Sequence, residues 1–382
     1  MMFFGILFFF ITFFRLSFIN ANLYLAIIPA FLGILLLFSK INKLNSLRIN
    51  KKYFSVFSLF VILFLYTAAL DVLQSGLTLS SSFFFRILSI ILFSFFPAYY
   101  ICSRIIGEDK SKLEKIVFIS FLIQLGFYII TYISPNTKIL IYSLLGASES
   151  SNLEDWNLTV RGFGLSGEIN FMTPSLMVLI SFLMFRGKTL FKLVTFILQV
   201  LNSNMTVIFG VLGILFDRGK LYLKIISMAL LYLVYQVIGK SLIEQYFPRF
   251  YAEYIESGGE RTANGLLSDH VFLAGDINFF NILFGFQKNV SSTIESNTKF
   301  SDIGWIIIFN YGGIILTILV ALLIVSVSFA TFKNRALIFL WIIVGILLNT
   351  KGLIIGLNGY FFITFTFMLT RYFDNKAMNK DV

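Results

Sequence analysis

The sequence of 382 residues is 58% hydrophobic and 13% charged, with a mean hydropathy of +0.88. A soluble domain is about half apolar and about a quarter charged, so this composition excludes a soluble globular domain and predicts an all-α protein whose solvent is lipid. The single cysteine, Cys102, and the single histidine, His270, exclude intrachain disulfides, cysteine-based zinc sites and histidine-rich metal sites. No metal and no cofactor are expected.

Apolar stretches follow one another along the chain, and a helix needs about 20 apolar residues to cross a bilayer. We expect twelve transmembrane helices, at 2–18, 22–39, 53–72, 84–104, 116–135, 171–185, 189–202, 205–216, 221–239, 303–331, 336–349 and 355–370. The pieces 189–202, 205–216 and 336–349 are short for a full crossing. The pair 189–216, broken at Asn202-Ser203-Asn204, is either two full spans or a re-entrant hairpin, and both alternatives return the chain to the same side.

The basic residues indicate the orientation of these spans. With both termini in the cytoplasm, the inside loops hold 20 of the 30 basic and 6 of the 19 acidic residues, which gives +14 inside and −3 outside. This is the positive-inside pattern, so the net charge of +11 needs no nucleic acid to explain it. We expect a single membrane domain, 1–382, with two long outer loops at 136–170 and 240–302.

The first outer loop ends in a pattern suited to an anion. Arg161 is followed by glycines, including Gly164, then by Glu168 and by Pro174 near the start of a helix. Glycine allows backbone to approach a ligand, exposed N–H groups at a helix start attract anions, and arginine matches phosphate geometry. One interpretation is a diphosphate clamp with a nearby carboxylate. The other is a flexible loop whose arginine pairs with a surface acid.

The second outer loop carries Arg249, Arg261 and His270. Its segment 265–286 has apolar residues at helical spacing and is predicted to lie as a helix on the membrane surface. His270 suits general base work or phosphate contact, although a histidine on the polar face of that helix is the alternative. Arg261, alone, is as well explained as a solvated loop charge.

The helix after this loop is expected to begin with Asp302 as its N-cap. Gly312 and Gly313 are expected to permit close helix packing.

Four patches together resemble the Wzy-type O-antigen and capsule polymerases, which are related to O-antigen ligases. The resemblance covers nearly the whole chain as topology and only these patches as sequence. They are Arg161, Gly164, Glu168, Asn170 and Pro174; Asn202-Ser203-Asn204-Met205-Thr206 with Gly210; Arg261 about twenty residues before Leu283-Phe284-Gly285-Phe286; and Ser301-Asp302-x-Gly304 with Gly312-Gly313. The chain departs from the family pattern in separating Asn170 from Pro174, where a Pro-Asn pair is frequent.

The resemblance implies a metal-independent glycosyltransferase in the bacterial inner membrane, acting at its periplasmic face. Its donor would be a growing chain on undecaprenyl diphosphate, and its acceptor a single repeat on the same carrier. Arg161 and Arg261, then Arg249, with Gly164, would bind the diphosphate. Glu168 or His270 would be the base, and Asp302 is a third candidate. A chain-length regulator and a flippase are the implied partners.

Two other functions fit the same sequence. A transporter or flippase of lipid-linked oligosaccharide fits twelve spans, but it should show two-half symmetry, and none is visible. An O-antigen ligase has nearly the same architecture and transfers the finished chain to lipid A core. The sequence leaves open the choice between polymerase and ligase, the sugars and linkage, the stereochemical outcome and the oligomeric state.

Overall fold

The computed structural model describes residues 1–18, 23–41, 51–73, 82–107, 109–145, 164–166, 172–200, 202–203, 205–217, 268–291 and 299–378. The predicted span 221–239 and the predicted site residues Arg161, Glu168, Arg249 and Arg261 lie outside this part of the chain. The chain forms two compact units: unit 1 is Met1–Ile28 with Arg104–Arg261, and unit 2 is Pro29–Ser103 with Thr262–Val382.

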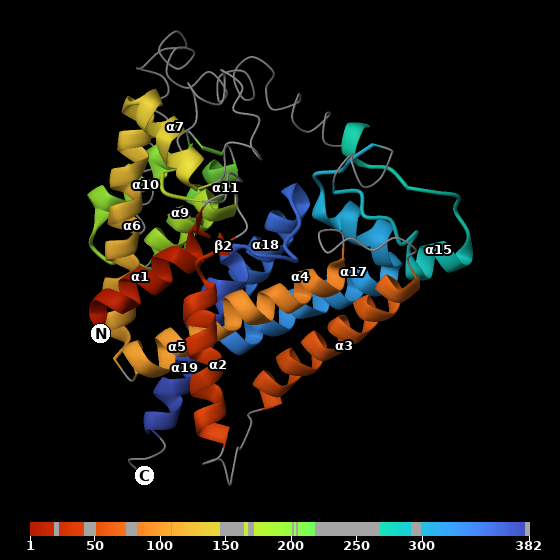
Figure 1. Ribbon diagram of the computed structural model, residues 1–382, viewed down its shortest axis with the longest axis horizontal. Helices are drawn as coiled ribbons and strands as arrows, with labels where there is room; N and C mark the ends of the chain where they lie inside the picture. Colours follow the sequence, from red (N-terminus) through yellow and green to blue (C-terminus); the bar gives the residue numbers. More distant parts are fainter. Residues whose placement is uncertain are drawn as a thin grey trace. The chain divides into compact units, whose positions relative to one another are not determined.

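Unit 1 is built from helices that surround a phenylalanine-rich core. In it, α1 packs against α6, and α9 packs against both α10 and α11 (Figure 1). Its described elements are α1 (Met2–Phe13), a short antiparallel pairing of β1 (Ser17–Phe18) with β2 (Leu23–Tyr24), α6 (Lys110–Ile133), α7 (Pro135–Leu144), α9 (Met172–Met184), α10 (Thr189–Val200) and α11 (Met205–Phe216).

The approach of α1 to α6 depends on a small residue. A Cβ atom on Gly5 would lie 2.8 Å from Cδ1 of Ile116, closer than side chains tolerate. Beside this contact, the rings of Phe9, Phe13 and Phe121 pack within 6.5 Å of one another, centroid to centroid. Such ring pairs add stability beyond the apolar area that they bury.

Unit 2 is arranged around its longest helix, α17, which packs against α3, α15, α18 and α19 (Figure 1). Its elements are most of α2 (Ile27–Ile41), α3 (Lys51–Leu73), α4 (Phe83–Ile90), the π-helical turn η1 (Ile91–Phe95), α5 (Phe96–Tyr100), the first half of the π-helical turn η2 (Ile101–Ile106), α15 (Phe279–Phe284), α17 (Gly304–Thr331), α18 (Arg335–Lys351) and α19 (Gly359–Met378).

The segment from α4 to η2 is one continuous helical rod whose hydrogen-bond spacing changes three times, from α to π, back to α and again to π. Pro97 stands in the first turn of α5, directly after η1. Because proline has no N–H and its ring crowds the preceding turn, a regular helix cannot pass through it without adjustment. The wider π-helical turn before Pro97 is that adjustment.

Four helical segments are long and apolar enough to cross a membrane: Lys52–Val72, Phe83–Ile106, Lys110–Ile133 and Gly304–Thr331. The described part of the chain therefore has the build of a helical membrane protein, as the composition predicts. Eleven of the twelve predicted apolar stretches fall on described residues, and each holds a helix. Several are short, however: α10 and α11 have 12 residues each, which is about 18 Å of helix.

The two segments predicted as outer loops contain short helices. The first, predicted at 136–170, begins with the helix α7. The prediction of one amphipathic helix over 265–286 is wrong: of the described residues there, 268–270 are helical, 271–278 are not, and α15 follows. Asn278 caps the start of α15, and Gly285, with a φ of 77°, ends it. Before Asn278, the backbone groups of Phe272 and Ala274 bond to the side chain of Asn310 in α17 and not to one another.

Candidate functional site

Asn310, in the first quarter of α17, holds residues 268–291, here called the late segment, in place. Its side-chain Oδ1 accepts from the N–H of Ala274 at 2.7 Å, and its Nδ2 donates to the carbonyl of Phe272 at 3.0 Å. Its own carbonyl accepts from the N–H of Phe286 at 2.8 Å. Asn310 is fully buried, so these bonds form away from water and fix residues 272–286 against the helix.

The glycine pair after Asn310 breaks the helix and lets the late segment approach. Gly313 has a φ of 66° and a ψ of −161°, a conformation that only glycine adopts readily. A Cβ atom there would lie 2.3 Å from the carbonyl oxygen of Leu283. The carbonyl of Gly312 accepts from the Tyr66 hydroxyl at 2.8 Å. Close packing at this pair is thus confirmed, and its partner is the end of α15.

The late segment brings two of the predicted site residues together, His270 and Asp302. Nε2 of His270 lies 3.9 Å from Oδ2 of Asp302, and the two side chains are 17% and 61% exposed. Ser301, next to Asp302 in the sequence, donates its hydroxyl to the His270 carbonyl at 2.7 Å, and its N–H bonds to the carbonyl of Val290 at 2.8 Å. A histidine and a carboxylate therefore face each other at an accessible surface.

The surroundings of His270 suit a proton acceptor. Nδ1 lies 3.3 Å from both the carbonyl of Phe300 and the N–H of Asp302, so it can donate to the first or accept from the second. When Nδ1 carries the proton and bonds to Phe300, Nε2 is free to take a proton from a hydroxyl. The carboxylate of Asp302 then lies where it stabilises the resulting imidazolium. The gap of 3.9 Å exceeds a direct hydrogen bond, which leaves room for a hydroxyl oxygen to contact both groups.

The prediction that Asp302 caps α17 is wrong. The N-cap residue is Ile303, which has no side-chain cap, and the N–H of Ile303 bonds to the hydroxyl of Ser301 at 3.1 Å. Because Ser301 provides the local hydrogen bond, the Asp302 carboxylate is directed to His270. The sequence analysis proposed Asp302 alone as the cap, and the hydrogen bonds of Ser301 to Ile303 and to His270 are contacts that it did not predict.

Gly164, in unit 1, is the described residue of the predicted diphosphate clamp. It is buried with a φ of 60°, and a Cβ atom there would lie 2.8 Å from Nε2 of Gln124. The next N–H, of Leu165, donates to Oε1 of Gln124 at 3.1 Å. The hydroxyl of Ser166 donates to the Phe14 carbonyl at 3.1 Å. The positive φ and the close Gln124 side chain favour glycine at this position, and the group that the backbone approaches is a neutral amide of the protein itself.

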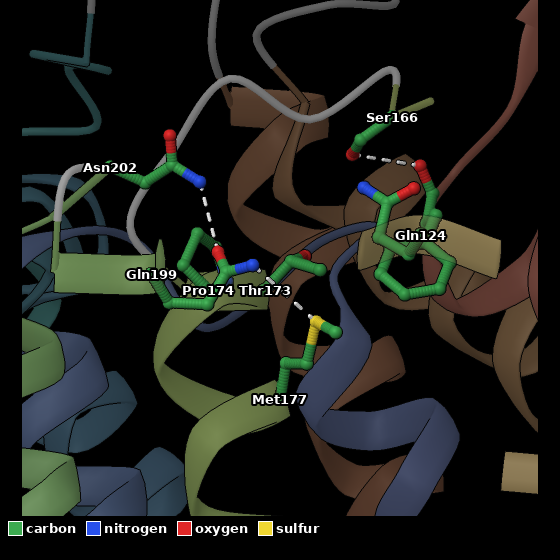
Figure 2. A pocket seen from close by; sticks show the side chains of 8 residues that line it. Gln124, Ser166, Thr173, Pro174, Met177, Gln199 and Asn202 are labelled. Carbon is green, nitrogen blue, oxygen red and sulfur yellow. Dashed lines mark hydrogen bonds between the residues drawn. The ribbon is translucent and has the colours of Figure 1, made fainter. Parts of the chain in front are cut away.

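The Gln124 side chain lines the same hollow as Gln199 and Asn202, which belong to a chain of buried hydrogen-bonded groups in unit 1. The Tyr128 hydroxyl donates to Oδ1 of Asn202 at 3.1 Å, and Nδ2 of Asn202 donates to Oε1 of Gln199 at 2.9 Å. Nε2 of Gln199 donates to the thioether sulfur of Met177 at 3.7 Å. Figure 2 shows Gln199 between Asn202 and Met177, facing a hollow lined by Phe14, Gln124, Ser166, Thr173, Pro174, Met177, Gln199 and Asn202.

Sequence reasoning missed most of this hollow. Gln124 and Gln199 are single polar residues within apolar stretches, and the site prediction was confined to the outer loops. The available signal was polar side chains inside predicted spans, which are costly in lipid and therefore mark functional sites. Among the residues that the structure describes, no group of three histidine, cysteine or acidic side chains is placed to hold a metal ion.

Comparison with protein-family models, with curated proteins and with solved structures finds no match to the chain.

Proposed function

We propose that the chain polymerises undecaprenyl-diphosphate-linked oligosaccharide repeats at the periplasmic face of a bacterial inner membrane. The observation that carries the proposal is the facing pair of His270, on the late segment, and Asp302, next to one of the four membrane-length helices. Glycosyl transfer to a hydroxyl needs a base of this kind. The proposed topology has twelve spans, both termini in the cytoplasm, and the segments 136–170 and 240–302 outside.

The proposed reaction is a displacement at the anomeric carbon of the donor chain. The acceptor sugar hydroxyl attacks that carbon, and its proton passes to Nε2 of His270. The bond from the anomeric carbon to the diphosphate breaks, and undecaprenyl diphosphate leaves with the bonding electrons. Asp302 stabilises the imidazolium that forms. We assign the diphosphate to Arg161, Arg261 and Arg249, which supply positive charge where negative charge develops.

A reconstituted system tests the proposal. The purified protein in proteoliposomes, given undecaprenyl-diphosphate-linked repeats, should produce a ladder of longer glycans. The variant H270Q should lower the rate about a hundredfold or more, since a general base contributes on the order of 10²–10⁴-fold. D302N should lower it about fivefold, because an exposed ion pair contributes up to about 1 kcal/mol. D276N removes a carboxylate from the same segment, beyond the His270 contact, and should leave the rate unchanged.

Other outcomes would replace the proposal with one of its rivals. A flippase moves repeats across the bilayer and never lengthens them, so transport without elongation would favour that function. A ligase transfers the chain to lipid A core, and its deletion strain has bare core, whereas loss of a polymerase leaves one repeat on the core. Full elongation by H270Q would remove His270 from the mechanism, with Glu168 as the next candidate.

A further inference from the structure

The late segment exposes large apolar side chains around the helix α15. The exposed fractions are 68% for Ile277, 78% for Phe279 and 56% for Phe280. No residue of α15 itself is buried. The single surface helix expected over 265–286 does not form, yet its apolar residues still gather on an open surface. Such a surface contacts a partner or a membrane.

The contact with α17 places α15 alongside that helix and not beyond its end (Figure 1). The glycine at Gly313 lies so close to α15 that a Cβ atom there would clash with the carbonyl of Leu283. Gly313 is 18 residues before the end of α17 at Thr331, which is about 27 Å at 1.5 Å per residue. Lys333 and Arg335 follow Thr331 and mark one edge of the hydrocarbon. Because the hydrocarbon core is about 30 Å thick, α15 lies near its opposite edge, and a tilt of α17 would place it deeper.

The helix α3 gives a similar level for this contact. The hydroxyl of Tyr66 donates to the carbonyl of Gly312 at 2.8 Å. Tyr66 is 14 residues after the start of the apolar span at Lys52, which is about 21 Å, and 6 residues before its end at Val72. The glycine pair that receives α15 therefore lies within the apolar length of two membrane-length helices.

The backbone around α15 has the hydrogen bonding that hydrocarbon requires. At its start, the side chain of Asn278 accepts from the N–H of Asn281 at 2.7 Å. After its end, the N–H groups of Phe286 and Gln287 donate, at 2.8 and 3.2 Å, to the two carbonyls of α17 just before the glycine pair. Backbone polar groups at the edge of the hydrocarbon must find partners within the protein, and these groups do.

The surface of α17 next to the contact faces lipid. Ile314, the residue after the glycine pair, is exposed, and so are Ile318 and Leu322, which follow at one-turn spacing. Exposed apolar side chains on a membrane-length helix contact acyl chains. An acyl chain that covers Ile314 therefore reaches the level of α15, so lipid is the occupant that is continuous with the exposed rings.

We infer that Ile277, Phe279 and Phe280 insert among the acyl chains at the edge of the hydrocarbon and anchor the late segment there. The inference concerns the placement of the segment and does not need the proposed function. The start of α17, next to Asp302, is nine residues, about 14 Å of helix, beyond the level of the anchor. The anchor thus sets the height of His270 and Asp302 above the hydrocarbon. If the proposed function holds, this is the height at which the sugars of a lipid-linked substrate project from the membrane.

Spin-label accessibility in proteoliposomes tests the anchor. The variants F279C and F280C, each labelled with a nitroxide, place the label at the ring positions. Oxygen concentrates in hydrocarbon, whereas a water-soluble nickel chelate is excluded from it. The controls are I318C, on the lipid-facing surface of α17, and D276C, at an exposed carboxylate of the same segment. Cys102 is fully buried, so the wild type should remain unlabelled.

The expected result is a ratio of oxygen to nickel collision rates several-fold higher in F279C and F280C than in D276C, and no higher than in I318C. Equal ratios in F279C, F280C and D276C would place the rings in water and overturn the anchor. Low collision rates with both reagents would also overturn it. Dipolar broadening between labels would then assign the surface to a second copy, and its absence would assign the surface to another segment of the same chain. Labels in lipid on a protein that elongates no glycan would count against the proposed function and support the anchor.

Discussion

Replacing Asn310 by leucine should release the late segment from α17. Leucine has a similar volume but cannot bond to the Ala274 N–H or the Phe272 carbonyl, which the asparagine joins at 2.7 and 3.0 Å. Each of the two hydrogen bonds contributes about 1 kcal/mol, and each half-buried backbone group left without its partner costs up to about 1 kcal/mol more. We therefore expect the late segment to lose about 2–4 kcal/mol of local stability.

Hydrogen exchange on the protein in nanodiscs measures this loss where it occurs. With about 1.4 kcal/mol for each factor of ten, the Ala274 amide should exchange roughly 30- to 700-fold faster in N310L. The matched control is N334A, which removes the N-cap bond from Asn334 to the N–H of Ala336, 2.9 Å long, at the start of α18. This control should loosen the first turn of α18 and leave Ala274 protected.

Two results would refute the reasoning about Asn310. If Ala274 is equally protected in N310L and the wild type, the late segment is held by other contacts. If exchange rises evenly over α3 and α17 as well, the substitution destabilises unit 2 as a whole and the local account is wrong.

Three further substitutions test other parts of the fold. G313A should destabilise the protein by about 3 kcal/mol or more, measured by denaturant titration, because its φ of 66° and the nearby carbonyl of Leu283 leave no place for a Cβ atom; a change below about 1 kcal/mol would contradict this. Lys192 and Asp217 lie 2.8 Å apart, with 5% and 21% of their side chains exposed, so D217N should lower the free energy of unfolding more than K192M, because it leaves the more buried charge unpaired. Equal losses in the two variants, or a coupling energy near zero in their double-mutant cycle, would refute this account of the pair. Burial lowers the pKa of Lys138 to about 8. The unfolded chain then binds more protons than the folded chain between about pH 8 and 10.4, so stability should rise with pH in that window by on the order of 1–2 kcal/mol, and K138M should abolish the rise in a Tm series.

The helices were predictable because lipid imposes a simple pattern. Stretches such as 53–72 and 116–135 are apolar over a membrane's thickness, and α3 and α6 occupy them. The break at Asn202 was predictable for the same reason, since polar residues interrupt an apolar run. The change in helical hydrogen-bond spacing before Pro97 follows from the chemistry of proline, although its π-helical form depends on packing.

The predictions that were wrong or missing concern residues whose contacts are distant in the sequence. Residues 272–274 have helical periodicity, yet Asn310, 36 residues beyond Ala274, binds their backbone and prevents the helix. Asp302 has the spacing of a cap, and Ser301 takes the local bond instead. The hydrogen bond from the Leu165 N–H to Gln124 connects residues that are 41 positions apart, so no local sequence pattern predicts it. In each case a single polar side chain satisfied by a remote partner outweighs the local propensity.

Sidedness of the late segment is the most direct test of the central claim, because the proposed polymerisation takes place at the periplasmic face of the membrane. Asp276 is exposed, and the one native cysteine, Cys102, is fully buried, so the variant Asp276→Cys offers a single accessible thiol. A membrane-impermeant maleimide applied to intact spheroplasts should label this variant and leave the wild type unlabelled. Labelling that occurs only after the membranes are opened would place the segment in the cytoplasm and contradict the proposed function.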